Sequence, residues 1–132
     1  MSLESLYARL RNAQNTYNRN SNKISRLKSA KRSVESSKSQ LSSRCNQLRG
    51  KANSQDTYGQ WVGSTQKQTR DFLANDVIGE YNYYIYLVDN RLDAICDEIT
   101  RLENENGHLL GVIGDLHEAI NNLLNELEKA TN

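Results

Sequence analysis

Apolar residues recur along the first part of the chain at alternating steps of three and four residues. The repeat runs from Leu3 to Leu48 and is interrupted only by Asn20, Lys31 and Lys38. A 3.5-residue repeat kept over many turns is typical of a helix that packs along its length against another helix. The pattern predicts a first helix over about residues 3–49, ended by a glycine at position 50 in the left-handed conformation.

A second repeat runs from Ile78 to Ala130, with Asn106 as its one polar position. Between the two repeats, residues 50–63 are rich in glycine and small polar residues, which favours a loop. We therefore expect one all-α domain over residues 1–132, a long antiparallel helical hairpin whose second helix covers about residues 64–130. Residues 104–108 contain turn-forming types, so a break there is the alternative to a continuous second helix.

The two expected helices differ in length, at roughly 70 Å and roughly 100 Å. If the turn joins Arg49 to Ser64, Leu3 lies opposite about Leu109, and the apolar seam beyond that point has no partner within the chain. Such a seam must fold back at Gly107 or bind another protein. The first predicted partner surface is therefore this seam, formed by Leu109, Ile113, Leu116, Ile120, Leu123 and Leu127.

A second predicted partner surface lies on the face of the second helix opposite its seam. Aromatic side chains are enriched where proteins bind one another, and this face carries several where polar residues are expected. Its members are Phe72, Leu73, Tyr83, Tyr86 and Leu87. The alternative is that a folded-back C-terminal segment covers them.

Charge divides between the two halves of the chain. Residues 1–52 hold twelve Lys/Arg and two acidic residues, a net charge of +10, and residues 53–132 hold five Lys/Arg and fourteen Asp/Glu, a net charge of −9. Mutual attraction of the two arms is a simpler interpretation of the basic arm than nucleic-acid binding. No apolar run approaches the roughly 20 residues of a membrane span, and we expect no cleavable signal peptide.

The sequence indicates no catalytic, cofactor or metal site. His108 and His117 lack ligand-type neighbours at metal-binding spacing, and the expected alignment keeps Cys45 and Cys96 too far apart for a disulfide. Three glycines at helical spacing, at positions 107, 111 and 114, indicate either a bend or the close approach of a partner helix. We predict that the protein is not an enzyme.

The sequence Trp61-Val62-Gly63 resembles the Trp-x-Gly turn of small helical hairpins of type VII secretion in Gram-positive bacteria. Within that group, the segment DFLANDVIGEYNYYIYLVDNRLDAICDEITRLENEN is most similar to the YwqH-like family, encoded beside LXG-domain toxins. Exported members carry a Tyr-x-x-x-Asp/Glu signal, which this chain lacks. Phe72 and Asp76 form a similar Phe-x-x-x-Asp pair, a candidate export motif.

The resemblance implies a chaperone-like targeting factor that binds the helical N-terminal domain of an LXG toxin. Its implied partners are that toxin, a second small helical protein and the secretion machinery, with no nucleic acid and no membrane insertion. The alternative is a structural homo-oligomeric coiled coil, for which a homodimer is the expected form. We expect a cytoplasmic location or export together with the toxin. Trp61 either caps the hairpin, next to a tight turn at Gly63, or contacts a partner.

Overall fold

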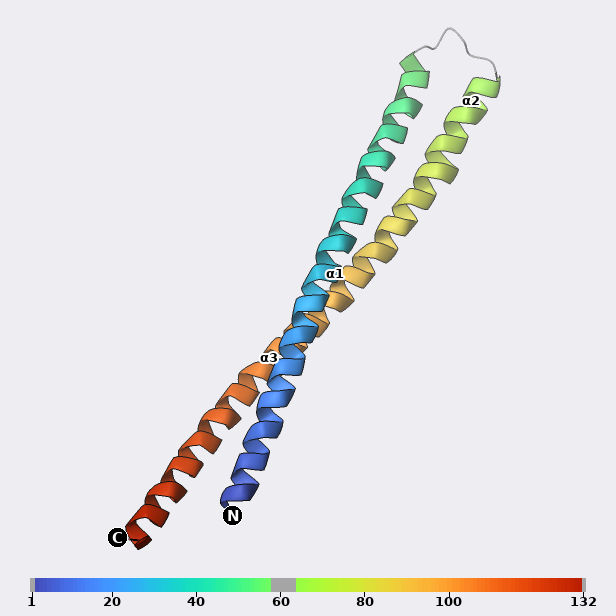
Figure 1. Cartoon of the computed structure of the whole chain (residues 1–132). Helices are drawn as coiled ribbons and strands as arrows, with labels where there is room; N and C mark the ends of the chain where they lie inside the picture. The colour runs from blue at the N-terminus through green and yellow to red at the C-terminus, as the bar shows by residue number, and fades with distance from the viewer. Residues whose placement is uncertain (1, 58–63, 132) are drawn as a thin grey trace. The chain divides into compact units, whose positions relative to one another are not determined.

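A computed structural model describes residues 2–57 and 64–131, and the side chains of residues 2–51 and 67–131. The chain is an all-helical hairpin (Figure 1) made of α1 (Leu3–Thr57), α2 (Ser64–Asp71), the π-helix η1 (Phe72–Val77) and α3 (Ile78–Thr131). The predicted Trp61-Val62-Gly63 turn lies outside the described residues. Two compact units make up the chain, and each is described by itself.

The first helix continues well past its predicted end. α1 runs through Gly50 to Thr57, and no described glycine has a positive φ, so Gly50 does not take the left-handed conformation of a helix cap. No proline interrupts the segment, and Ala52 continues the apolar repeat one step beyond Leu48. The prediction of a helix end at Arg49 is therefore wrong.

The predicted seams are the faces that the two long helices cover. Every seam position from Leu3 to Leu48 in α1, and from Ile78 to Leu123 in α3, is buried or half-buried. Leu127, near the end of α3, is 49% exposed. The 3.5-residue repeat thus identified the packed faces, including the polar positions Asn20 and Asn106, which are 5% and 7% exposed.

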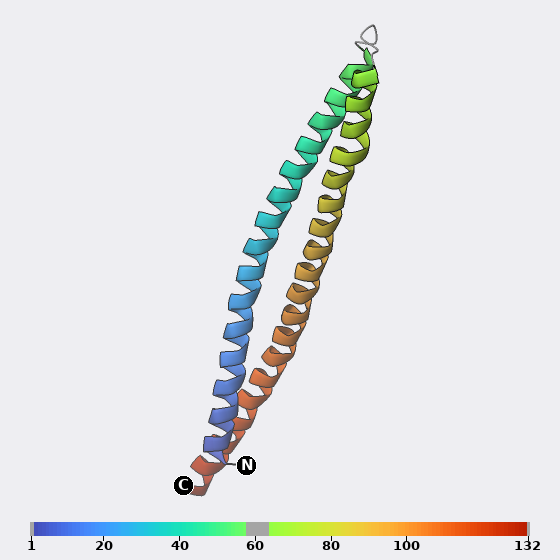
Figure 2. The same ribbon diagram turned by 90° about the vertical axis from the view of Figure 1, so that its right-hand side faces the viewer.

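Unit 1 joins residues Met1–Ser29 to Cys96–Asn132. The start of α1, blue in Figure 2, lies beside the C-terminal part of α3, orange to red. The core cluster of this unit consists of Leu6, Leu10, Ala13, Leu116 and Ile120, and Leu3, Leu109, Val112, Ile113, Ala119 and Leu123 pack against it. The Ser2 hydroxyl accepts a hydrogen bond from the Ser5 amide at 3.1 Å and caps the start of α1.

This packing corrects the predicted alignment of the helices. The earlier alignment placed Asn106 opposite about Tyr7, whereas its side-chain amide donates to the Tyr17 carbonyl at 3.3 Å and to the Ser21 hydroxyl at 3.2 Å. Because α1 ends later than predicted, the facing positions shift along α1. The seam from Leu109 to Leu123 therefore has its partner within the chain, and the expectation of an unpaired seam is wrong.

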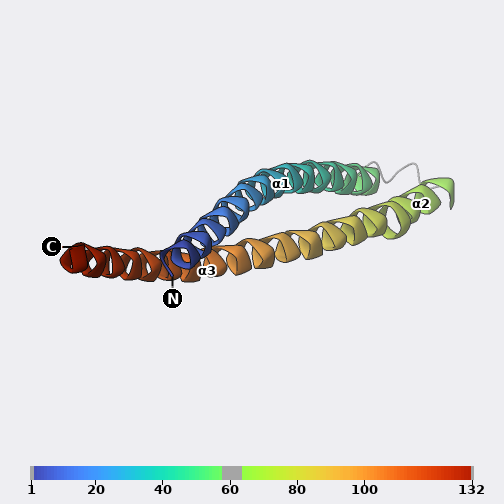
Figure 3. The same ribbon diagram turned by 60° about the horizontal axis from the view of Figure 1, so that its bottom comes forward.

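α3 is continuous from Ile78 to Thr131 (Figure 3), so the alternative of a break near residues 104–108 is also wrong. Tertiary packing of the seam outweighs the weak local preference of Asn104 and Gly107 for a turn. A methyl group placed on Gly107, Gly111 or Gly114 would meet nothing within 4 Å. These glycines therefore lie within an unbroken helix and beside open space.

Unit 2 covers Ala30–Ile95 and joins the second part of α1 to α2, η1 and the start of α3. Buried Cys45 and exposed Arg49 both donate to the Asn82 side-chain oxygen, at 3.8 Å and 3.2 Å. The half-exposed pair Lys38–Asp89 lies 2.6 Å apart across the two arms. The seam of this unit is thus held by polar contacts as well as apolar ones, as the opposite charges of the arms led us to expect.

The π-helix η1 changes which residues face the seam. Its last turn is closed by a hydrogen bond from the Ile78 amide to the Leu73 carbonyl, five residues back. Continued backwards from Ile78, the heptad would turn Ala74 inward. The extra residue of the wide turn leaves Ala74 exposed and Leu73 half-buried instead.

Candidate functional site

The exposed large side chains of unit 2 gather in η1 and the beginning of α3. We call these five residues the aromatic segment: Phe72 (55% exposed), Tyr83 (58%), Tyr84 (53%), Tyr86 (60%) and Leu87 (37%). The rings of Tyr83 and Tyr84 are tilted by 55° with their centroids 6.3 Å apart. Exposed aromatic side chains at this density form a surface suited to another protein.

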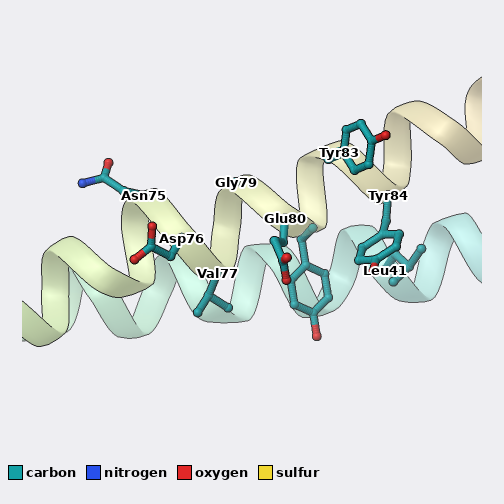
Figure 4. Close-up of a pocket in the computed structure, with 9 residues that line it drawn as sticks. Leu41, Asn75, Asp76, Val77, Gly79, Glu80, Tyr83 and Tyr84 are labelled. Carbon is teal, nitrogen blue, oxygen red and sulfur yellow. The ribbon is translucent and has the colours of Figure 1, made fainter.

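A groove of about 650 Å³ adjoins the aromatic segment. In Figure 4, Val77 and Tyr84 point towards α1, where Leu41 lies, while Asn75 and Tyr83 point away from it. Its lining residues come from α1, η1 and α3: Leu41, Asn75, Asp76, Val77, Gly79, Glu80, Tyr81, Tyr83 and Tyr84. The groove is therefore built where the wide turn of η1 passes into α3.

Two carboxylates and a glycine are among the residues that line the groove. Asp76 and Glu80 stand four residues apart, a spacing that brings side chains near one another on a helical surface. Gly79 has open space within 4 Å of where its Cβ would stand. The groove thus combines negative charge, aromatic rings and apolar side chains.

The members of the predicted aromatic surface differ in their exposure to solvent. Tyr83, Tyr86, Leu87 and Phe72 are exposed, whereas Leu73 is half-buried because the π-helix turns it inward. Of the predicted export pair, Phe72 belongs to the aromatic segment and Asp76 lines the groove.

The residues of the predicted seam surface pack within the chain, with the exception of Leu127. Leu116 and Ile120 are in the core cluster of unit 1, and Leu109, Ile113 and Leu123 pack against that cluster. Only Leu127 of this set is exposed. These residues hold the two helices of unit 1 together, so their apolar character needs no second protein.

Sequence reasoning missed Glu80, Tyr84 and Gly79 as lining residues. Glu80, Tyr84 and Leu87 follow a spacing of four and three residues, which places them on one flank of the seam. That spacing was visible in the sequence. The groove beside them was not, because its lining residues come from α1, η1 and α3, and the alignment of the helices was predicted wrongly.

The described residues include acidic side chains, two histidines and two cysteines. No group of three His, Cys, Asp or Glu residues among them is placed to hold a metal ion. Cys45 is buried and Cys96 half-buried, and both are free thiols. Within the described ranges, no helix is both long and apolar enough to cross a membrane.

One ion pair on the surface of unit 1 shifts the protonation of its members. Arg101 donates to both carboxylate oxygens of Glu98, at 2.6 Å and 3.0 Å, and to Glu105 at 3.3 Å. These hydrogen bonds lower the pKa of Glu98 and raise the pKa of Arg101. The Arg101 side chain is 58% exposed and the Glu98 side chain 44%, so the pair is a solvated helix-surface contact rather than an active-site arrangement.

Comparison with known proteins gives a family and nothing finer. No curated protein and no solved structure matches the chain. A family model described as YwqH-like matches residues 2–130, almost the whole sequence. The chain therefore belongs to the YwqH-like family.

Proposed function

We propose that this chain is a non-enzymatic, chaperone-like targeting protein that binds the helical N-terminal domain of an LXG toxin for type VII secretion. The observation that carries the proposal is the aromatic segment. It leaves five large apolar side chains exposed on a hairpin whose seam is already filled by its own two helices. The LXG partner comes from the resemblance of the Trp61-Val62-Gly63 sequence and its surroundings to such accessory proteins.

Packing considerations support binding rather than a purely structural role. In unit 1, the apolar seam side chains lie against the core cluster of the same chain, so they contribute stability. In unit 2, Tyr83, Tyr84 and Tyr86 are each more than half exposed and contribute little to the packing of this unit. Tyrosine combines an apolar ring with a hydroxyl, so it suits a surface that faces water in the free protein and is covered in the complex.

The toxin domain is expected to bind as a helix laid along the aromatic segment. An amphipathic partner helix presents its apolar side chains at steps of three and four, which match the positions of Tyr83, Tyr86 and Leu87. In this scheme the protein acts in the cytoplasm and leaves the cell with its toxin.

Co-expression with the helical N-terminal domain of an LXG toxin tests the binding. The whole chain is expected to copurify with the toxin domain and to form a complex of defined mass in light scattering. Tyr83→Ser with Tyr86→Ser should weaken the complex by about 100-fold, because two interface aromatics typically contribute about 2.7 kcal/mol or more together.

Tyr7→Ser is the matched control, because Tyr7 is also an exposed tyrosine (42%) but lies in α1 of unit 1. Circular dichroism would show that all variants remain folded. A stable homodimer that ignores the co-expressed toxin domain would refute the proposal and favour the alternative of a structural homo-oligomeric coiled coil. An equal loss of binding in the control would show that the aromatic segment is not the surface used.

A further inference from the structure

The groove beside the aromatic segment has a chemistry that specifies what can enter it. We propose that it receives an arginine side chain from a helix of the binding partner, held between the carboxylates of Asp76 and Glu80 and the rings of Tyr83 and Tyr84. This inference rests on the proposed function and deepens it, because it names the group that the partner must present.

The charge of the groove is not neutralised within the described part of the chain. None of its lining residues is basic, and no described residue forms an ion pair or hydrogen bond with Asp76 or Glu80. Other acidic residues of this unit do have a cation beside them: Lys38 lies 2.6 Å from Asp89, and Arg70 lies 3.8 Å from Asp71. Two carboxylates that line one groove without an ion-pair partner among the described residues attract a cation from outside.

The aromatic rings favour a guanidinium over other cations. The exposed rings of Tyr83 and Tyr84 have centroids 6.3 Å apart and are inclined by 55°. A planar guanidinium stacks on such a ring and still donates to a carboxylate through its edge, which an ammonium does less well. A metal ion is a poor fit, because no metal-binding group of three ligands occurs among the described residues.

The shape of the groove suits a long side chain. Leu41 and Val77 are apolar members of its lining, and the methylene groups of an arginine can pack on such side chains while the charged end reaches a carboxylate. Gly79 leaves space beside the helix backbone, so a partner helix can approach closely. A volume of about 650 Å³ is within the range of pockets that enclose a sizeable ligand.

Neutralising the two carboxylates tests the proposal. The probe is the helical N-terminal domain of an LXG toxin that copurifies with this protein, titrated calorimetrically into the whole chain. Asp76→Asn with Glu80→Gln should weaken binding about tenfold, equal to about 1.4 kcal/mol, and should make the affinity less sensitive to salt. The control is Asp93→Asn with Asp97→Asn, two exposed acidic residues at the same spacing outside the groove, which should change the affinity less than twofold.

Two results would overturn the inference without affecting the proposed function. One is unchanged affinity in the Asp76/Glu80 variant while the tyrosine variants lose binding. The other is an equal loss in the control, which would indicate a general effect of net charge. A homodimer of the wild-type chain that this variant converts to monomer would instead assign the groove to an arginine of a second copy.

A probe that needs no toxin separates the two ideas completely. N-acetyl-arginine amide, titrated into the whole isotope-labelled chain, should shift the amide resonances around Asp76, Glu80 and Tyr84. The citrulline analogue, which has nearly the same size without the charge, should not shift them. Shifts spread evenly over all the acidic residues of the chain would show that the groove has no preference for arginine.

Discussion

Two asparagines, one in each long helix, interrupt an otherwise apolar seam in unit 1. Asn20 is 5% exposed and Asn106 is 7% exposed, and the Asn106 amide bonds to Tyr17 and Ser21, on either side of Asn20. The Asn20 side-chain nitrogen and the Asn106 side-chain oxygen have no hydrogen-bond partner. A buried polar layer of this kind reduces stability while it favours one alignment of the helices.

Replacing both asparagines by leucine tests that balance. Asn20→Leu with Asn106→Leu should raise the free energy of unfolding by about 1–3 kcal/mol, because two unsatisfied buried polar atoms are removed. Urea denaturation followed by circular dichroism measures the change. Asn104→Leu, at an exposed position of α3, should alter it by less than about 0.5 kcal/mol. A loss of stability in the double variant would mean that the polar layer stabilises the seam.

At the scale of the elements, the heptad repeat predicted which faces are buried but not how the helices align. Burial of Leu6 or Leu116 follows from their spacing alone, since a continuous apolar stripe must be covered. Alignment depends on where α1 ends, and a glycine such as Gly50 occurs inside helices as well as after their ends, at a cost of about 1 kcal/mol relative to alanine in the interior. Because the end of α1 was predicted too early, every predicted pair of facing residues was shifted along that helix.

The π-helix shows a different limit of sequence reasoning. Leu73, Val77 and Tyr81 stand four residues apart, a spacing that occurs by chance in many ordinary helices. Nothing in the amino-acid types of Phe72–Val77 indicates a turn with one extra residue. The aromatic residues could be recognised as a surface from their positions, but the acidic groove beside them includes residues of this unpredicted π-helix.

The corrected packing of α3 changes what a mutation in its C-terminal part should do. Leu116→Ala removes a core side chain that is 5% exposed, and should lower the free energy of unfolding by about 2–4 kcal/mol. Leu110→Ala, at a position 55% exposed on the same helix, should lower it by less than about 1 kcal/mol. Chemical denaturation of both variants checks this. Equal effects would mean that α1 does not cover Leu116 in solution.

For the whole molecule, the described side chains of the two units differ in how many of them are buried. In unit 1 the side chains of Leu10, Ile99 and Leu102 are among many that are buried, whereas in unit 2 the fully buried positions are Cys45 and Ile78, within its described residues. Burial limits local opening of a helix. Unit 2, which has fewer buried seam side chains among its described residues, is also the unit that carries the aromatic segment.

Hydrogen exchange should reveal this difference. Backbone amides around Leu102 should exchange more slowly than those around Leu41, because local opening exposes more buried apolar surface in unit 1. Mass spectrometry on peptides from both units gives the comparison, with intrinsic exchange rates as the correction for sequence. Binding of the toxin domain should then slow exchange mainly in unit 2. Uniform exchange along α1 would contradict the difference in packing.

The opposite charges of the two arms act in both units. In unit 1, residues 1–29 hold six basic residues and one acidic residue, against two basic and eight acidic in residues 96–132, so net charges of +5 and −6 face each other. In unit 2, residues 30–52 have six basic and one acidic, a net +5, and residues 53–95 have three basic and six acidic, a net −3. Repulsion within an arm persists in the unfolded chain, since those charges remain neighbours in sequence, whereas attraction between arms requires the folded hairpin.

Salt should therefore destabilise the fold. Raising NaCl from about 0.01 M to about 1 M shortens the screening length from about 30 Å to about 3 Å, below the separation of packed helices of about 8–10 Å. The melting temperature measured by circular dichroism should fall over this range. Lys38→Gln with Asp89→Asn removes a contact of 2.6 Å between the arms and should reduce the fall. A melting temperature that rises steadily with NaCl would mean that screening of repulsion within each arm outweighs the attraction between them, and that the apolar seams hold the hairpin without help from its charges.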